Sequence, residues 1–213
     1  MVFTGDEFAD GGEVIIDVLN KNDVKASFFL TGKFYKNPAF RSIIEKLKSN
    51  DHYMGAHSDQ HLLYADWTNR DSLLVTKRQF TKDLLKNYGR MKSFKIDKTN
   101  AQYFLPPYEW YNRSIAKWTQ ELGLTLINFS PGTRSAADYT YPGMNGYRSS
   151  AEIYNSIIDY EQRDENGLNG FILLTHIGTD SRRTDKFYMK LDQLIHELKG
   201  KGYALVKIND LLK

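Results

Sequence analysis

Short apolar runs alternate with helical patterns along the whole chain. Seven runs predict buried strands, at residues 2–4, 25–30, 53–56, 102–105, 124–129, 170–175 and 203–206. Between them, apolar side chains recur with the 3.6-residue period of a helix, at residues 13–20, 38–47, 70–88, 112–122 and 186–199. Regular alternation of strands and helices is typical of a parallel sheet covered by helices. We therefore predict an α/β fold, a (β/α) barrel of about seven parallel strands, complete or incomplete.

Capping residues support several of these helix boundaries. Asn112 precedes a helical segment that Gly123 ends. Ser149 and Glu152 form the Ser-x-x-Glu pattern of a capping box, which predicts a further helix from that point. No repeat, low-complexity tract or linker interrupts the pattern, so we predict one domain over residues 1–213.

The candidate chemistry of the chain lies where the predicted strands end. In a parallel barrel, the loops that follow the strands converge on one face and form the active site. Four segments with potential ligands or catalytic groups fall there: Asp6 and Glu7 after the first strand, His57 and His61 after the third, Pro107 and Tyr108 after the fourth, and His176 at the end of the sixth. We expect these side chains to meet at one site.

Composition narrows the chemistry of such a site. The chain has no cysteine, so a metal ion there has to be held by His, Asp or Glu, and a cysteine nucleophile is excluded. The 29 basic and 26 acidic residues leave a net charge of +3 and are scattered, so no nucleic-acid interface is expected. No apolar run approaches the roughly 20 residues of a membrane span. The first residues do not resemble a signal peptide, and because functional-looking residues begin at Asp6 we expect a domain cut from a longer secreted protein.

The two histidines after the third strand suggest a metal site. His57 and His61 lie four positions apart, so one helical turn or a tight loop directs both imidazoles at one ion, although the same spacing occurs by chance on solvated helices. A zinc-type site also needs a third ligand, and Asp6 and Glu7 are adjacent carboxylates at a neighbouring strand end. If one binds the metal, the other is close enough to accept a proton from metal-bound water. An exposed acidic turn is the alternative for this doublet.

His176 ends a strongly apolar strand. A histidine at such a position is often a satisfied core residue. The alternative is a general acid, on the side of the site opposite the carboxylate base. His52 and His196 lie among charged neighbours, and we expect both to be solvated.

These residues resemble the motifs of the polysaccharide deacetylases of carbohydrate esterase family 4, the NodB-like domain. Residues 4–8 are similar to the family's Thr-Phe-Asp-Asp-Gly, and residues 57–61 reproduce its His-Ser/Thr-x-x-His in full. Residues 105–108 match its Arg-x-Pro-Tyr in part, and residues 174–176 match its Leu-x-His. A partial match to its Asp-Trp motif occurs at 138–139. The resemblance covers almost the whole chain.

The resemblance implies a distorted (β/α) barrel that hydrolyses N- or O-linked acetyl groups of a carbohydrate polymer or oligosaccharide. It implies a divalent metal, zinc with cobalt, nickel or manganese as alternatives, and a location outside the cytoplasm, in the periplasm, on the surface or secreted. The implied roles are Glu7, His57 and His61 as metal ligands, Asp6 as base, His176 as acid, and the backbone N–H of Tyr108 as a donor to the developing oxyanion.

Departures from the family pattern affect these roles. Glu7 replaces an aspartate, which lengthens the ligand arm and makes Asp10 an alternative ligand. Leu105 replaces an arginine that supports the base, and Arg134 is a candidate to take its place. Asp138, in the same long loop, is expected to orient and charge-stabilise the catalytic histidine that ends the sixth strand.

Aromatic side chains beside the second and third motifs are candidates for stacking on a sugar ring. The predicted substrate-binding residues are Pro107, Tyr108, Trp110 and Trp67. For the tryptophans, packing in the core or at its rim is the alternative. Two other functions stay open: a carbohydrate-binding pseudoenzyme, favoured by the missing arginine and the altered first motif, and a metal amidohydrolase acting on a non-carbohydrate amide.

Overall fold

One sheet of six parallel strands forms the centre of the fold, seen in a computed structural model that describes all 213 residues. The strands run in the order β5-β4-β3-β2-β1-β6. Their bounds are β1 Val2–Gly5, β2 Ser27–Leu30, β3 Tyr53–Ala56, β4 Tyr103–Phe104, β5 Thr125–Leu126 and β6 Leu174–His176. Every strand pair in the sheet is parallel, which confirms the predicted α/β class.

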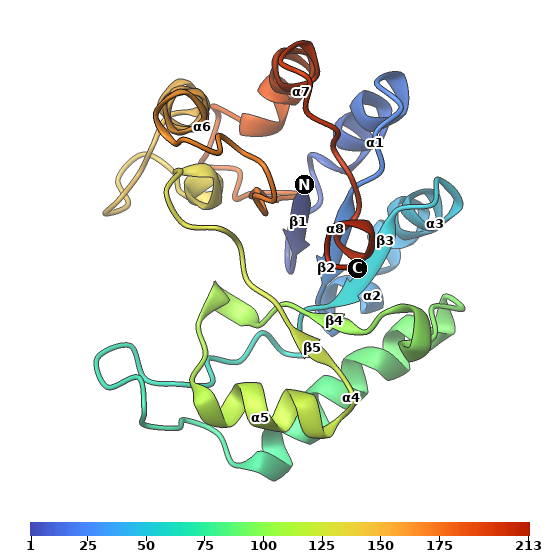
Figure 1. Cartoon of the computed structure of the whole chain (residues 1–213). Coiled ribbons are helices and arrows are strands. Elements are labelled where there is room, and N and C mark those ends of the chain that lie inside the picture. The colour runs from blue at the N-terminus through green and yellow to red at the C-terminus, as the bar shows by residue number, and fades with distance from the viewer.

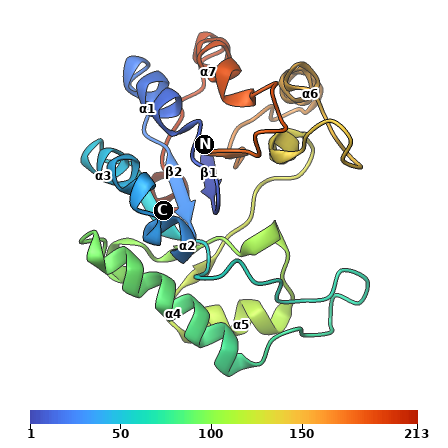
Figure 2. The ribbon, with the colours of Figure 1, turned by 180° about the vertical axis from the view of Figure 1, so that it is seen from behind.

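Helices surround the strands on the outside, except the last, which lies in the middle of the view (Figure 1). The helices are α1 Gly12–Lys21, α2 Gly32–Lys36, α3 Arg41–Ser49, α4 Lys77–Ser93, α5 Arg113–Glu121, α6 Ser150–Arg163, α7 Leu191–Gly200 and α8 Ile208–Leu211. The view from behind shows α2 beside α4, close to the end of β2 (Figure 2). The predicted caps are present, because the side chain of Asn112 accepts from Ile115 N and Ser149 forms a capping box with Glu152.

The strands bury side chains on both faces, which is why they are continuous apolar runs in the sequence. Neighbouring residues of a strand point to opposite faces of the sheet. Accordingly, Val2 and Phe29 belong to a cluster of 7 buried hydrophobic residues. Phe3 and Phe28 belong to a separate cluster of 39, which includes side chains of the surrounding helices. The smaller cluster lies inside the curved sheet, and the larger one lies between the sheet and the helices.

The barrel is incomplete between its edge strands, β5 and β6, which do not pair with each other. Beyond these strands, Ser130 N donates to Ile172 O and Ile172 N donates to Ser130 Oγ, both at 3.0 Å, so the two edges are joined by single contacts. At the opposite end of the strands, Ile208 of α8 packs into the inner cluster and its N–H donates to Ser27 Oγ at 2.8 Å. The expected barrel is therefore distorted and closed in part by irregular chain.

The predicted seventh strand is wrong. Residues 203–206 form no strand, and Tyr203 N donates to Leu198 O at the end of α7. Tyr203 and Leu205 pack against the outer core while the residues between and after them are exposed. The apolar alternation therefore reflects packing across the outer surface of the core, where no sheet edge is available.

The predicted helix at 70–88 is also displaced. The helix observed, α4, begins after Thr76, whose side chain accepts from Gln79 N while the Gln79 side chain accepts from Thr76 N. This capping box fixes the start of the helix. Residues 70–76, which were predicted to be helical, form an irregular loop. None of the helices combines the length and the apolar character that crossing a bilayer requires.

Candidate active site at the strand ends

A cavity of about 510 Å³ opens where β1, β3 and β6 end. Its polar lining includes Asp6, Glu7, His57, His61, Glu109 and His176, and its aromatic lining includes Phe8, Trp67, Tyr108, Tyr139 and Tyr141. Side chains from all four predicted segments thus meet at one place, on the face where a parallel barrel carries its chemistry.

The histidine pair lies on a tight loop directly after β3. Ser58 and His61 both have a left-handed backbone, with φ of 71° and 56°, and His61 N donates to Ser58 Oγ at 2.8 Å. The loop turns the two imidazoles toward each other, with 5.1 Å between the centroids of His57 and His61. Of the two geometries expected from the spacing, the tight loop is the one observed.

Helix α4 holds this loop from below. Asn87 accepts from His57 N at 3.0 Å and donates to Leu30 O at 3.2 Å, which ties the loop to the end of β2. Asp83 accepts from Asp59 N at 3.2 Å and from Gln60 N at 3.0 Å. Both acceptors are one turn apart on the same face of the helix, so α4 fixes the backbone of the loop at several points.

The buried carboxylate of Asp59 fits tightly under the loop. It lies 3.2 Å from Lys86 Nζ and 3.5 Å from Arg90 Nε, and both cations come from α4. A Cβ at Gly32, the first residue of α2, would lie 1.9 Å from Asp59 Oδ1. Only glycine therefore lets α2 approach the loop so closely.

Both histidines of the pair are in the neutral form that binds metals. The pKa of His57 is lowered to about 3, mainly by burial and to a smaller extent by His61. Burial lowers the pKa of His61 to about 4, with a smaller contribution from Lys33. The carbonyl of Leu105 accepts a hydrogen bond from His57 Nδ1 at 2.7 Å, so Nδ1 carries the proton and the lone pair is on Nε2. A carbonyl that fixes the tautomer in this way is common behind metal-binding histidines.

The two carboxylates after β1 lie next to a lysine that sequence reasoning missed. Lys33 Nζ lies 3.3 Å from Asp6 Oδ2 and 3.4 Å from Glu7 Oε1, and Thr31 Oγ1 donates to Asp6 Oδ1 at 2.8 Å. Asp6 Oδ2 is also 4.0 Å from His61 Nδ1, whereas the Glu7 side chain is 63% exposed. Asp6 is therefore the carboxylate that already lies beside the histidine pair.

Neither Leu105 nor Arg134 takes the place of the arginine that supports the base in the family pattern. The side chain of Leu105 is fully buried in the inner cluster. Arg134 is exposed, and its backbone N–H donates to Ser156 of α6. Lys33 is the cation that contacts Asp6, and it follows directly on Gly32 in the short helix α2, which the apolar pattern did not predict.

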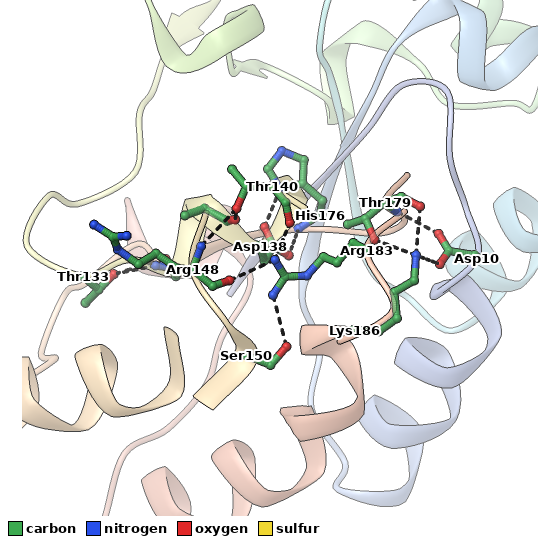
Figure 3. Close-up of polar contacts among 12 residues, drawn as sticks. Asp10, Thr133, Asp138, Thr140, Arg148, Ser150, His176, Thr179, Arg183 and Lys186 are labelled. Carbon is green, nitrogen blue, oxygen red and sulfur yellow. Dashed lines mark hydrogen bonds and ion pairs between the residues drawn. The ribbon is translucent and has the colours of Figure 1, made fainter. Parts of the chain in front are cut away.

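His176 is paired with Asp138, and Figure 3 shows the carboxylate beneath the imidazole ring. Asp138 Oδ1 lies 2.6 Å from His176 Nδ1, and Oδ2 accepts from His176 N at 2.8 Å. Burial by itself lowers the pKa of His176, but the charge and hydrogen bond of Asp138 outweigh it, so the pKa is raised above 6.5. Nδ1 faces Asp138, which leaves the Nε2 edge for the cavity.

A buried arginine holds the loop that carries Asp138. Arg183 donates to the carbonyl oxygens of Thr140 and Arg148 and to Ser150 Oγ, as Figure 3 shows. These contacts tie the segment after Asp138 to the start of α6. The arrangement explains how an aspartate in a long loop of few regular elements keeps a fixed position.

Asp10, the alternative ligand, is occupied elsewhere. Its Oδ2 lies 2.8 Å from Lys186 Nζ and accepts from Tyr188 OH at 3.0 Å, and its Oδ1 accepts from Thr179 N at 2.7 Å (Figure 3). Both oxygens join the loop after β1 to the loop after β6. The residue therefore has a structural role in this arrangement.

The aromatic residues form a rim on one side of the cavity. The ring of Tyr108 lies against His61, with 4.5 Å between centroids, and Trp67 packs edge-on against Tyr108 at 5.7 Å. Trp110 packs behind Trp67, and Pro107 is buried, so neither lines the cavity. Tyr139, which sequence reasoning did not place in the site, packs against the ring of His176 at 5.2 Å on the opposite side.

Outside the cavity, His52 is not solvated as expected. It is buried, its Nδ1 accepts from Ala26 N at 3.2 Å, and burial lowers its pKa to about 4. The charged residues next to it in the chain gave no signal of this packing. His196 is exposed on α7, as predicted.

The donor atoms in the cavity suit a divalent metal in part. Two neutral imidazoles, one with its tautomer fixed, suit zinc and related ions, and a carboxylate lies beside them. No three His, Asp or Glu side chains converge closely enough to hold an ion without side-chain movement. His57 and His61 therefore fit a metal, and a carboxylate has to turn toward them to complete the site.

Comparisons with known proteins agree with this arrangement. Residues 6–127, more than half of the chain, match the family described as Polysaccharide deacetylase. The chain is 24% identical over 200 residues to a peptidoglycan-N-acetylglucosamine deacetylase of Bacillus cereus, covering 93% of the chain and 80% of that protein. It is 25% identical over 200 residues to the peptidoglycan-N-acetylmuramic acid deacetylase PdaA of Bacillus subtilis, covering 93% of the chain and 65% of that protein. The chain thus spans just under two thirds of the B. subtilis relative.

A solved structure shows the same fold. A family 4 carbohydrate esterase pseudoenzyme from Bacillus anthracis superimposes with a TM-score of 0.72 at 19% identity, covering 100% of the chain and 65% of that protein. At this identity, the likeness shows the fold alone. It confirms the distorted barrel that the motif resemblance implied.

Proposed function

The chain belongs to the polysaccharide deacetylase family, and on that premise we propose that it is a metal-dependent hydrolase that removes acetyl groups from a carbohydrate polymer or oligosaccharide. The observation that carries the proposal is the meeting of two neutral histidines, a carboxylate and a carboxylate-paired histidine in one cavity. These groups supply a metal site, a base and an acid around a single volume.

His57 and His61 would hold the metal through their imidazole lone pairs. When bound, a divalent metal polarises the acetyl carbonyl and lowers the pKa of water. Asp6 and Glu7 divide the two remaining roles, one as ligand and the other as base. The resemblance puts Glu7 on the metal and makes Asp6 the base, while the distances place Asp6 closer to His61. A zinc titration distinguishes the two assignments. Asp6→Asn should lower the affinity for Zn²⁺ if Asp6 is the ligand, and Glu7→Gln should lower it if Glu7 is the ligand.

His176 would protonate the leaving amine or alkoxide, since its pKa is raised and Asp138 stabilises the imidazolium. Lys33 would hold the carboxylate of Asp6 in place, the role for which Leu105 is unsuited. The backbone N–H of Tyr108 is the proposed donor to the oxyanion. Trp67, Tyr108 and Tyr139 form the rim against which a sugar ring would stack.

The proposed substrate and location rest on membership of the polysaccharide deacetylase family. The relatives named above are peptidoglycan deacetylases, and peptidoglycan lies outside the cytoplasm. We propose that this chain also acts on an acetylated carbohydrate outside the cytoplasm, as a domain of a longer protein. Zinc is the proposed metal, with cobalt, nickel and manganese as alternatives.

The test measures acetate release from N-acetylated and O-acetylated oligosaccharides. Chelated protein is assayed before and after Zn²⁺, Co²⁺, Ni²⁺ or Mn²⁺ is added, and one of these metals should restore release. His57→Ala should lower kcat/KM by more than about 100-fold, because it removes a ligand and changes to the hydrogen-bond partners of ligands alone cost roughly 10- to 100-fold. His196→Ala, which changes an exposed histidine on α7, is the matched control and should retain activity.

A carbohydrate-binding pseudoenzyme is the second candidate. It is favoured by Leu105, an apolar side chain in the inner core where the family's arginine is expected. Binding of oligosaccharides by wild-type protein, with no acetate released under any metal, would support this reading and contradict the first.

A further inference from the structure

Glu109 is a carboxylic acid in the cavity that neither the motifs nor the proposed mechanism uses. It is the last residue of the short 3-10 turn Pro107–Glu109 after β4, and it lines the cavity together with His57, His61 and His176. The residue is half-buried. Its position is fixed by the fold and not by a flexible loop end.

The backbone around Glu109 is held in an unusual conformation. Tyr108 and Glu109 both lie in the left-handed region, with φ of 59° and 54°. Residues other than glycine rarely adopt this backbone conformation, and two such residues in succession are rarer still. Glu109 N donates to Pro106 O at 3.0 Å and Asn128 Nδ2 donates to Glu109 O at 2.9 Å, so both backbone groups are pinned. Strained backbone that the surroundings fix in this way is concentrated at functional sites.

The carboxyl group itself has no partner within the chain. No hydrogen bond or ion pair is formed by its oxygens, although its surroundings are polar. The pKa of Glu109 is raised to about 7, mainly by burial, with His176 lowering it and Asp138 raising it by smaller amounts. The chain therefore places an unpaired carboxyl group, carried on a strained backbone, beside the His176 and Asp138 pair.

The place of Glu109 indicates which part of a substrate it would meet. His176 is the proposed acid, so the leaving atom of the sugar would lie next to it and near Glu109. In an acetamido sugar the leaving nitrogen carries an N–H, which a carboxylate accepts. In an acetyl ester the leaving oxygen carries no hydrogen, and a carboxylate beside it is left without a partner.

We infer that Glu109 accepts a hydrogen bond from the acetamido N–H of the substrate and selects N-acetylated over O-acetylated carbohydrates. This inference rests on the proposed function. A site that hydrogen-bonds a substrate N–H discriminates strongly against an analogue that lacks it. The residue contacts the substrate and takes no part in proton transfer.

The experiment compares two acetylated substrates on the full chain loaded with the activating metal. Acetate release is measured from a chito-oligosaccharide and from an acetylated xylo-oligosaccharide, for wild type, Glu109→Ala and Glu109→Gln. Wild type should favour the N-acetyl substrate roughly 10- to 100-fold in kcat/KM, the factor expected from one hydrogen bond to a charged group. Glu109→Ala should lose about that factor on the N-acetyl substrate and keep its rate on the ester. Glu109→Gln should retain most of the N-acetyl activity, because its amide oxygen still accepts.

Three outcomes would overturn the inference: an equal loss on both substrates, no change on either, or a wild type that prefers the ester. Glu165→Gln, which changes an exposed glutamate after α6, is the matched control. Thermal unfolding of each variant excludes misfolding as the cause, since Ala and Gln face the same left-handed backbone as Glu.

A binding measurement separates failure of this inference from failure of the proposed function. If wild type releases acetate from neither substrate, the proposed function fails. Calorimetric titration of the same two oligosaccharides into chelated wild type and Glu109→Ala then decides the role of Glu109. Roughly tenfold weaker binding of the N-acetylated ligand alone supports it. Equal or absent weakening overturns it.

Discussion

At the scale of single residues, the chemistry of the site depends on how each polar side chain is paired. His57 is neutral and donates to Leu105 O, whereas His176 is paired with a carboxylate and has a raised pKa. One imidazole is therefore suited to bind a cation and the other to give up a proton. The difference between the two histidines comes from the hydrogen-bond partner of Nδ1, which is a carbonyl for His57 and a carboxylate for His176.

The pairing of His176 predicts a pH dependence. Because Asp138 raises the pKa of His176, the imidazole is protonated up to a higher pH, so activity that needs the acid should fall only as pH rises through this raised pKa. Asp138→Asn removes the charge that raises the pKa, while burial still lowers it. The alkaline limb of kcat/KM should then move to lower pH. An unchanged limb in a pH-rate profile would contradict the role of His176.

Lys33 predicts a second effect at this scale. Lys33→Met removes the cation beside Asp6 and Glu7 and should lower kcat roughly fivefold with little change in KM, since a partly exposed ion pair contributes about 1 kcal/mol. Lys33→Arg should restore most of the loss. Lys36→Met, on the same helix but exposed and unpaired, is the control. Full activity of Lys33→Met at saturating metal would show that Asp6 needs no cation.

Many of these side-chain contacts could not be predicted from the sequence. The histidine motif, the doublet after β1 and His176 were predicted because each follows an apolar run. Asp138 was placed only by resemblance, and its contact with His176, 38 positions away, depends on the loop that Arg183 holds. Lys33 was missed because the short helix α2 has too few residues to show a periodic pattern. Glu109 was missed because no local signal in the sequence marks a half-buried carboxyl group in a turn.

At the scale of elements, helix α4 and helix α2 determine the shape of the histidine loop. Asp83 and Asn87 bind its backbone, and Gly32 lets α2 contact Asp59. The helix start at Thr76 was mispredicted, although Thr76-x-x-Gln79 is a capping signal in the sequence. The apolar residues upstream outweighed it in the prediction, but Leu73 and Leu74 lie in a mostly exposed loop.

Gly32→Ala tests this support. The new Cβ would meet Asp59 Oδ1 at 1.9 Å, so either the loop or α2 has to move. Overpacking of this kind destabilises by typically 1–3 kcal/mol, and the affinity of the site for Zn²⁺ should fall as well. Gly89→Ala, on α4 with no atom within 4 Å of the new Cβ, is the control and should stabilise by roughly 0.5–1 kcal/mol. Urea unfolding and zinc titration of both variants check this, and a tolerated Gly32→Ala would contradict it.

At the scale of the whole molecule, the incomplete barrel brings distant segments to one face. The strand order places β1 between β2 and β6, so Asp6 and His176 follow neighbouring strands although they are far apart in sequence. The α/β class and six of the seven strands were predictable from apolar runs. The gap between β5 and β6 was not, because it depends on pairing between edges that no local pattern encodes.

The central claim is that one divalent ion at His57 and His61 makes this site hydrolytic. The most direct measurement is the rate of acetate release from an N-acetylated oligosaccharide as Zn²⁺ is added stepwise to chelated wild-type protein. We predict no release at first, then a linear rise that stops at about one equivalent. Release by the fully chelated protein, or none at any amount of zinc, cobalt, nickel or manganese, would contradict the claim.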